Sequence, residues 1–399
     1  MTRKLFSRKT RGGRTLSGFA VTISLAVTAA IAVGCGESTS DSSAVDIAKL
    51  DSGNYPTAPQ DMETVKDDAS GAVQESIRMA EHIPLMLDID SRLVYGRSFV
   101  THAYTAKYPP SMDSKGVKFK DAAPGLIAGW STFGNRRSGN QPGTKVEFKL
   151  LRFDTNEHAA NAAKAMAEDS NAVYPAKMPL TVNGYPMSSA FLSQYDSVKT
   201  WTPHDNFVAE TYISNNMATP PDPAPLLDLT KRMLDKQFEL LKGYKPTPAD
   251  KLSEVPADID GLLGKTIPSD KPTVTTGVYT SHAALHRQTQ PDSIKRAFED
   301  ADVDLVAERG SILFRTANSA AAKRLLAAYL AQGVDRYEAM DSPPGLPDTR
   351  CSRTKDESAA DSKYRCFLSH DRYVALVPSE QPQDLYQKTA AQYKLLAGG

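Results

Sequence analysis

The sequence of 399 residues is poor in cysteine and has no excess charge of either sign. It contains three cysteines and two tryptophans, and its 47 basic residues equal its 47 acidic ones, so the formal net charge is zero. Three cysteines exclude the dense disulfide framework of a small secreted domain. Without a basic excess, the chain lacks the attraction for phosphates on which nucleic-acid binding depends, and we expect no nucleic-acid partner.

The sequence also lacks the motifs of several common enzyme classes. It has no phosphate-binding P-loop, no G-x-G-x-x-G dinucleotide fingerprint and no H-E-x-x-H zinc motif. The serine in GWSTFG (residues 129–134) lies in a stretch one residue too long for the G-x-S-x-G nucleophile elbow. The apolar segment 125–134 is typical of a buried strand, with a pocket lining as the alternative. We therefore expect no cofactor and assign no catalytic residue.

Two groups of closely spaced aspartates resemble phosphatase and calcium motifs only in part. Asp88 and Asp90 follow an apolar run, as in phosphatases of the haloacid dehalogenase type, but Arg92 stands where that class has threonine or valine. The second group is Asp300, Asp302 and Asp304. A calcium loop that begins there would need glycine where Leu305 stands. We expect surface acids in both places and no metal site.

The N-terminus has no apolar run long enough to span a membrane. Residues 19–33 form an apolar run of about 15 residues, whereas a transmembrane helix needs roughly 20. The 18 residues before this run contain six basic residues and no acidic ones. A basic segment followed by a short apolar one is typical of an export signal.

Residues 31–40 read IAVGCGESTS, so the apolar run ends in small residues and a cysteine. This arrangement resembles the lipobox of bacterial lipoproteins. The resemblance implies that residues 1–34 are a signal peptide and that Cys35 is the lipidation site, where diacylglyceryl and palmitate-type chains anchor the protein on the extracytoplasmic face of the cell membrane. Two or more acyl chains hold stably where one does not. Residues 35–68 are then a polar tether. A secreted protein with a chance cysteine is the alternative.

The mature chain is mildly acidic and keeps two cysteines. After residues 1–34 are removed, 41 basic residues stand against 47 acidic ones, a net charge of about −6. Cys351 and Cys366 are an even pair in an oxidising compartment, which favours a disulfide bond. Closing a loop of this size stabilises a chain by about 3 kcal/mol in the chain-entropy model. A reactive or metal-binding pair is the alternative.

The mature chain contains an internal repeat, with one copy in each half. Residues 149–166 and 310–327 both read as an apolar strand that ends in phenylalanine, then threonine, then an alanine-rich helix. Thr155 and Thr316 are placed to cap these helices. Three further pairs of similar segments follow in the same order: 98–105 and 278–285, 206–214 and 372–379, 227–243 and 383–399. Four pairs in one order indicate a duplication.

The repeat predicts an α+β protein of two tandem domains. We expect an N-terminal domain over residues 69–244, a proline-rich linker over 245–272 and a C-terminal domain over 273–399. The order of elements in the second domain, βαββαββα, suggests a duplicated ferredoxin-like (βαββαβ-type) fold with helices on one face. In the first domain, a long loop over about residues 106–145 replaces the first helix. Residues 50–60 contain apolar side chains that a plain tether does not need, so we expect this segment to dock onto the domain.

Seven histidines give no catalytic pattern. His282 and His286 are four residues apart in an expected strand, 276–285, which would place them about 13 Å apart on one face. His102 and His282 occupy matching places in the repeat. Because active sites seldom arise twice at matching positions, a structural role is favoured over catalysis.

The lipobox, the segment LDSGNYPTAPQ (residues 50–60) and the duplicated F-x-T-x-x-x-A-A unit together resemble a family of actinobacterial envelope lipoproteins found in mycobacteria, nocardiae and their relatives. The function of that family is unassigned, so the resemblance implies location and architecture and transfers no active site. We expect a non-catalytic module that binds an envelope lipid, a cell-wall glycan or an envelope protein. A hydrolase with an unrecognised active site is the alternative, and a purely structural role is a third possibility.

Overall fold

The computed structural model describes residues 45–67, 69–97, 102–139, 141–269, 274–356 and 363–398. From Val45 on, the described residues form one compact unit. The predicted signal peptide, the lipidation site Cys35 and the first part of the tether therefore lie outside the described residues. No described helix is both long enough and apolar enough to cross a membrane.

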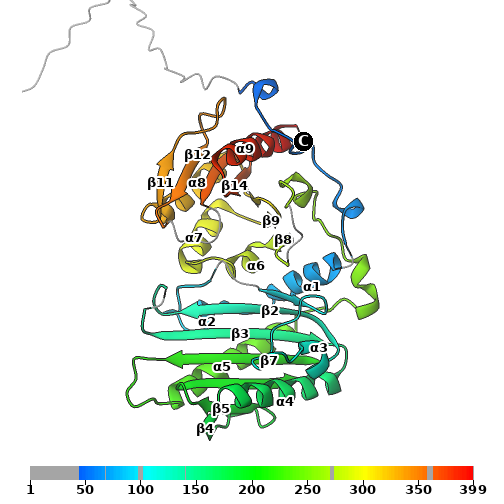
Figure 1. Ribbon diagram of the computed structural model, residues 1–399, viewed down its shortest axis with the longest axis vertical. Coiled ribbons are helices and arrows are strands. Elements are labelled where there is room, and N and C mark those ends of the chain that lie inside the picture. Colours follow the sequence, from blue (N-terminus) through cyan, green and yellow to red (C-terminus); the bar gives the residue numbers. More distant parts are fainter. Residues whose placement is uncertain are drawn as a thin grey trace, which may run out of the picture. The chain divides into compact units, whose positions relative to one another are not determined.

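The N-terminal half folds around a seven-stranded antiparallel sheet, sheet A, in the spatial order β1-β2-β3-β7-β6-β5-β4 (Figure 1). Its strands are β1 (Ala103–Thr105), β2 (Leu126–Asn135), β3 (Thr144–Phe153), β4 (Ala176–Pro179), β5 (Ser189–Ser193), β6 (Ser197–His204) and β7 (Phe207–Asn215). Its helices are α1 (Ser70–Ala80), α2 (Met86–Ile89), α3 (Phe119–Ala122), α4 (Asn156–Val173) and α5 (Ala224–Leu241).

The C-terminal half folds around a second seven-stranded sheet, sheet B, in the order β11-β12-β13-β14-β10-β9-β8. Its strands are β8 (Gly277–Thr280), β9 (Leu305–Glu308), β10 (Ile312–Arg315), β11 (Tyr337–Met340), β12 (Arg350–Thr354), β13 (Tyr364–His370) and β14 (Tyr373–Ser379). Its helices are α6 (Ser281–Leu285), α7 (Pro291–Ala301), α8 (Ser319–Gly333) and α9 (Pro382–Ala397).

The two sheets have the same topology. In each, the first three strands lie side by side in chain order, and the last four follow in reverse order. The last hairpin of each half turns at an aspartate with positive φ, 49° at Asp205 and 48° at Asp371, a conformation that aspartate tolerates better than most residues. The internal repeat of the sequence thus corresponds to a repeated strand order.

The ferredoxin-like arrangement is not confirmed. A split βαβ unit contains parallel strands, whereas every pair of neighbouring strands in both sheets is antiparallel. The coarser prediction of a mixed α+β protein with two tandem domains holds. The sheets are larger than expected because β11, β12 and their counterparts β4 and β5 extend each of them.

Helices cover both faces of each sheet, not one face as predicted. Successive side chains of a strand point to opposite faces. In sheet A, Phe153 packs with α4 in one cluster, while Leu150 belongs to the core on the opposite face. In sheet B, Phe314 packs against α8 and the adjacent Leu313 packs against α9. Each half is therefore a three-layer sandwich.

The strand predicted over residues 276–285 is wrong in its second part. β8 ends at Thr280, whose hydroxyl accepts a hydrogen bond from the amide of Ala283 and caps α6. His282 therefore lies on a helix, and its ring centroid is 5.2 Å from that of His286. His102 lies just before β1, whereas His282 lies just after β8, so the two histidines are not at equivalent places.

One of the two predicted helix caps is confirmed. Thr155 accepts a hydrogen bond from the amide of His158 and begins α4. Thr316 does not cap α8, because that helix begins three residues later, at Ser319, and Asn318 is its cap. The Thr316 hydroxyl instead donates to the carbonyl of Arg372.

Residues 106–145 are not the long loop that the sequence suggested. They contain α3 and the ten residues of β2, every one of which is buried. Segment 125–134 is thus part of the sheet core. The apolar run before Asp88 does not form a strand either, because residues 86–89 make the short helix α2.

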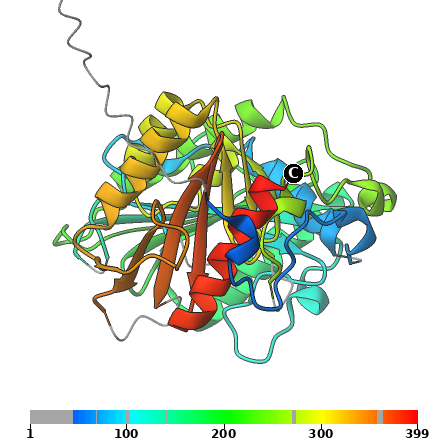
Figure 2. The same ribbon diagram turned by 90° about the horizontal axis from the view of Figure 1, so that it is seen from above.

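The first described residues dock onto the C-terminal half. Figure 2 shows this segment, residues 45–60, beside α9; we call it the strap. Leu50 is 5% exposed and packs with Leu346 and Ala390. The Tyr55 hydroxyl donates to the Asp384 carboxylate at 2.5 Å. The predicted tether is therefore in part an ordered component of the fold.

The two halves also share a core. Buried residues of both, such as Trp130 and Tyr279, belong to one hydrophobic cluster. Gln74 on α1 pairs with the free edge of β8: its amide donates to the Val278 carbonyl at 2.7 Å and its oxygen accepts from the Val278 amide at 3.1 Å. A single side chain thus substitutes for a neighbouring strand at the edge of sheet B.

Candidate functional site

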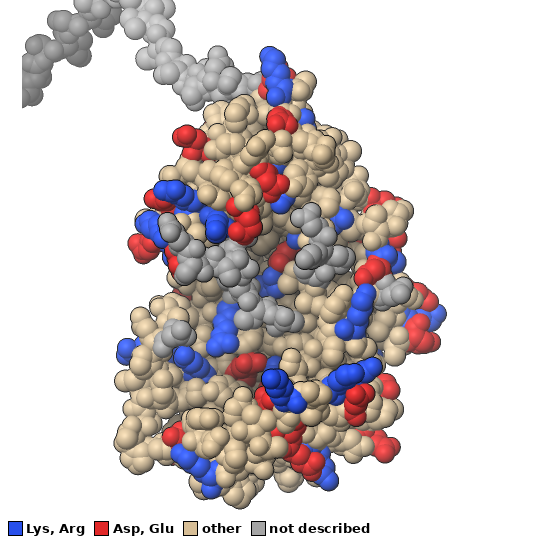
Figure 3. Space-filling view, viewed as in Figure 1, with Lys and Arg blue, Asp and Glu red and all other residues tan. Residues whose placement is uncertain are grey.

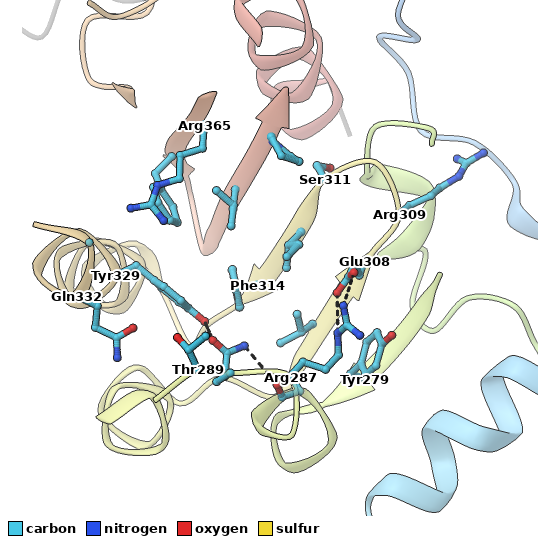
Figure 4. A pocket seen from close by; sticks show the side chains of 18 of the residues that line it. Tyr279, Arg287, Thr289, Glu308, Arg309, Ser311, Phe314, Tyr329, Gln332 and Arg365 are labelled. Atoms are coloured by element: carbon cyan, nitrogen blue, oxygen red, sulfur yellow. Dashed lines mark hydrogen bonds and ion pairs between the residues drawn. The ribbon is translucent and has the colours of Figure 1, made fainter. Parts of the chain in front are cut away.

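A cavity of about 300 Å³ lies in the C-terminal half, between sheet B and the helices on its α8 face (Figure 4). This volume is at the lower end of the range for small-molecule sites, about 300–1,000 Å³. Most of the surface that faces the cavity is apolar, and about half of the 21 lining residues are apolar or aromatic. The apolar and aromatic lining residues are Tyr279, Ala284, Val306, Ile312, Phe314, Tyr329, Tyr337, Phe367, Leu376 and Pro378.

The cavity exists because α8 covers only part of the sheet. Tyr329, near the end of this helix, packs on Phe314 and Phe367, with ring centroids 5.0 and 5.8 Å apart. The helix ends at Gly333. The cavity lies at this end of the helix, where Gly333 lines it together with residues of β13 and β14.

One wall of the cavity holds an ion pair in which both carboxylate oxygens are hydrogen-bonded. The Arg287 guanidinium donates to both carboxylate oxygens of Glu308, at 3.0 and 2.7 Å. Its third nitrogen, Nη1, is buried and has no hydrogen-bond partner. The two charges neutralise one another, so this wall contributes little net potential to the cavity.

The opposite wall holds an arginine without a carboxylate. Arg365 on β13 stacks on the ring of Tyr337, with Cζ 3.3 Å from the ring centroid, and lies 5.2 Å from that of Phe367. Its Nε donates to the Ser352 hydroxyl at 3.2 Å. Within the described part of the chain, no acidic side chain forms an ion pair with it. Burial is the main cause that lowers the pKa of Arg365 to about 10, and the like charge of Arg336 adds to it.

Gly333 allows the Arg365 side chain to pass over the end of α8. A Cβ at this position would lie 2.2 Å from Nη2 of Arg365. Arg336, three residues later and exposed, lies with Cζ 5.8 Å from the same Tyr337 ring. Two guanidinium groups therefore flank one aromatic ring at this end of the cavity.

The lining offers contacts for binding more than groups for acid–base chemistry. Among the described lining residues there is no histidine and no cysteine. The Ser311 hydroxyl donates to Gln392 at 2.6 Å and accepts from the amide of Ile267 at 3.0 Å. Over the described ranges, no group of three or more His, Cys, Asp or Glu side chains could hold a metal ion.

The predicted disulfide is present. Cys351 and Cys366 are bonded and lie directly opposite one another on β12 and β13. Cys366 points to the α9 side, and the adjacent Arg365 therefore points into the cavity (Figure 4). The crosslink thus holds β13, the strand that carries Arg365, in place. The sequence did not reveal that this arginine lines a cavity.

The aspartate groups do not form a site. Asp90 accepts two hydrogen bonds from the Arg92 guanidinium, which is the main cause that lowers its pKa to about 2. Asp304 pairs with Arg315 at 2.7 Å. Asp302 ends α7 in the left-handed conformation. These are ion pairs and turn residues, as expected for surface acids.

The histidines named above bond to the backbone and to a threonine. His282 contacts the Ile83 carbonyl at 2.8 Å, and His286 contacts the Ala80 carbonyl at 3.1 Å and the Thr132 hydroxyl at 2.7 Å. Burial lowers the pKa of His102 to about 4. These contacts fit a structural part in joining α1 and sheet A to α6.

Comparison with known families matches both halves to domains without an assigned function. Residues 62–257 match the N-terminal domain of unknown function DUF7373, and residues 262–399 match its C-terminal counterpart. No curated protein matches the sequence. Among solved structures, the extracellular domain of PknH from Mycobacterium tuberculosis is matched at 11% identity with a TM-score of 0.27, over 40% of this chain and 94% of that one.

Proposed function

This chain belongs to the DUF7373 family, and because that family has no assigned function, we propose a function from the site itself. We propose a lipid-anchored, extracytoplasmic binding protein that holds a small, largely apolar ligand in the cavity of its C-terminal half. The observation that carries the proposal is the cavity of about 300 Å³ with its mainly apolar lining. Such a lining favours an envelope lipid over a glycan or a protein surface as the ligand.

Two features support a location outside the cytosol. Disulfides persist in oxidising compartments, and Cys351 and Cys366 form one. The basic segment, the short apolar run and the cysteine at position 35 form the pattern of a bacterial lipoprotein signal. The resemblance to actinobacterial envelope lipoproteins is part of the same proposal.

The architecture fits a duplicated module. We infer that the domains over residues 69–244 and 273–399 descend from one unit, joined by the linker 245–272. The matching strand order of the two sheets supports this inference. The face shown in Figure 3 carries basic and acidic side chains interspersed, without a large area of one sign. A cavity is therefore a better candidate for recognition than that charged surface.

Replacing Cys35 by alanine should release the protein from the membrane. With the thiol present, the chain should enter the detergent phase on phase separation, and mass spectrometry should find an acylated N-terminus at residue 35. With alanine there, the same protein should remain in the aqueous phase, because no acyl chain is attached. An acyl-free wild-type chain that keeps residues 1–34 would contradict the anchor.

Native mass spectrometry should detect a ligand on the wild-type protein after incubation with envelope lipid extract. Leu376→Trp adds bulk inside the cavity and should abolish the bound mass, because the ligand and the indole need the same space. Met187→Trp, at a side chain that is 74% exposed, is the control and should retain it. Failure of the wild-type protein to retain any component would argue against a binding function for the cavity.

A further inference from the structure

We propose that the cavity selects an anionic amphiphile, with a carboxylate or phosphate head at Arg365 and Arg336 and an apolar body over Phe314 and Leu376. This inference rests on the proposed binding function and specifies its ligand. The head would lie beside Tyr337, at the end of α8, and the apolar part would fill the space between α8 and the sheet.

The charges around the cavity do not balance. Glu308 is the single carboxylate among the described lining residues, and Arg287 already holds both of its oxygens. Arg365 and Arg336 have no acidic partner within the described ranges. A half-buried arginine without a counter-ion is costly, and a bound anion would relieve that cost by charge-assisted hydrogen bonds.

The remaining basic residue of the lining, Arg309, does not point into the cavity. Arg309 contributes to the lining, but its side chain turns away from the cavity toward the strap (Figure 4). Its Nη1 donates to the Gln60 side chain at 2.7 Å. The positive charge available to a ligand is therefore concentrated at the Arg365 end.

The equivalent place in sheet A also has a basic side chain stacked on a tyrosine, but there an acidic side chain balances its charge. β6 has the place in sheet A that β13 has in sheet B. Lys199 on β6 lies 4.0 Å from the ring centroid of Tyr174, directly after α4, just as Arg365 lies over Tyr337, shortly after α8. Lys199, however, pairs with Asp113 at 3.1 Å and donates to Ser170 at 2.7 Å.

Neighbouring residues on this face of the two sheets also differ: they are charged in sheet A and apolar in sheet B. In sheet A, Lys149 on β3 is paired in register with Glu210 on β7, and the two form an ion pair at 3.3 Å. The equivalent strands of sheet B place Ile312 opposite Leu376. The C-terminal half thus keeps the stacked cation and replaces the neighbouring ion pair with apolar side chains. An amphiphilic anion supplies what is missing there, a negative head and an apolar body.

Isothermal titration of the purified full chain with octanoate, octyl phosphate and octanamide tests the inference. Octanamide has the chain length and nearly the shape of octanoate but no charge. We expect both anions to bind at least about tenfold more tightly than octanamide, because hydrogen bonds to charged groups are stronger than neutral ones. A comparison of the two anions shows whether a carboxylate or a phosphate head is preferred.

Three variants test whether the preference for an anion depends on Arg365. Arg365→Met keeps the apolar stem and removes the charge, so the preference for octanoate over octanamide should disappear. Gly333→Ala should reduce it by displacing the guanidinium. Lys199→Met, at the equivalent place in sheet A, is the matched control and should leave it unchanged.

Three outcomes would overturn the inference. Equal affinities for octanoate and octanamide would remove the selectivity and leave a binding function intact. A preference that persists in Arg365→Met would place the anion elsewhere. Absence of binding by all three probes, with a ligand still retained from lipid extract, would reject this ligand class. If Arg365→Met does not fold, the inference is still tested by the affinities of the wild-type protein for octanoate and octanamide and by the same comparison in Gly333→Ala.

Discussion

Replacing Glu75 by alanine is expected to lower the free energy of unfolding by about 3–5 kcal/mol, the usual cost of removing one partner from a buried ion pair. The Glu75 side chain is fully buried on α1. Its carboxylate accepts from Arg152 at 3.1 Å and from Arg78 at 2.5 Å. It also accepts from the amide and the hydroxyl of Thr247, each at 2.9 Å, and from the Tyr244 hydroxyl.

The large effect follows from what the substitution leaves behind. Arg152 on β3 is 5% exposed and would keep its charge without the carboxylate that now balances it. The same carboxylate joins α1, sheet A and the segment after α5, so three parts of the N-terminal half lose a common contact.

Chemical denaturation followed by tryptophan fluorescence measures this effect, because Trp130 and Trp201 are both buried in this half. Asp228→Ala is the control. Asp228 pairs with Arg232 on the surface of α5 with both side chains exposed, and such pairs contribute less than about 1 kcal/mol. Similar losses in the two variants would show that the buried carboxylate has no special part in stability.

Removing the disulfide is expected to lower the free energy of unfolding by about 3 kcal/mol in the chain-entropy model for a loop of this length. The 14 residues between Cys351 and Cys366, a sequence separation of 15, include a polar segment, and without the bond that segment adds entropy to the unfolded chain. Both cysteines are buried, so the double alanine variant keeps apolar side chains at these positions and tests the crosslink itself.

Denaturation monitored by circular dichroism, with and without reductant, checks this expectation. Reductant should destabilise the wild-type protein and should have no effect on the double alanine variant. A wild-type protein whose unfolding is insensitive to reductant would contradict the prediction. Because β13 presents Arg365, the same comparison should show weaker anion binding once the crosslink is lost.

Local signals predicted much of the fold. The apolar strand that ends at Phe153, with Thr155 behind it, marks the start of α4, and Pro291 marks the start of α7. The hairpin of β13 and β14 turns at Asp371, a residue type that favours tight turns. In these places the residue types that favour an element also lie where the tertiary structure needs it.

Other elements carried no readable pattern. β11 and β12 are short strands of partly exposed residues, so neither shows the alternation that reveals a strand. The segment SHAAL alternates like a strand but forms α6, because the Thr280 cap and the packing of His286 favour a helix there. The periodicity of a sequence gives no information on such tertiary contacts.

The candidate site was not visible in the sequence. Arg365 is the last residue of a polar stretch between the two cysteines and looks like a surface residue. Its importance comes from the end of α8 at Gly333 and the position of Tyr337, which depend on how distant segments pack. The alternation of β13, in which Cys366 faces the core, was the one available hint that its neighbour faces the other side.

The strap ties the first described residues to α9, and this sets an order of events. Lys394 holds the Leu50 carbonyl at 2.9 Å and Gln387 holds Asp51 at 3.1 Å, contacts between residues more than 300 positions apart. A ribosome or translocation channel that releases the chain from its N-terminus delivers the strap long before α9. The strap therefore cannot dock until α9 has been made and has folded onto sheet B, so its docking is a late event in the folding of the C-terminal half.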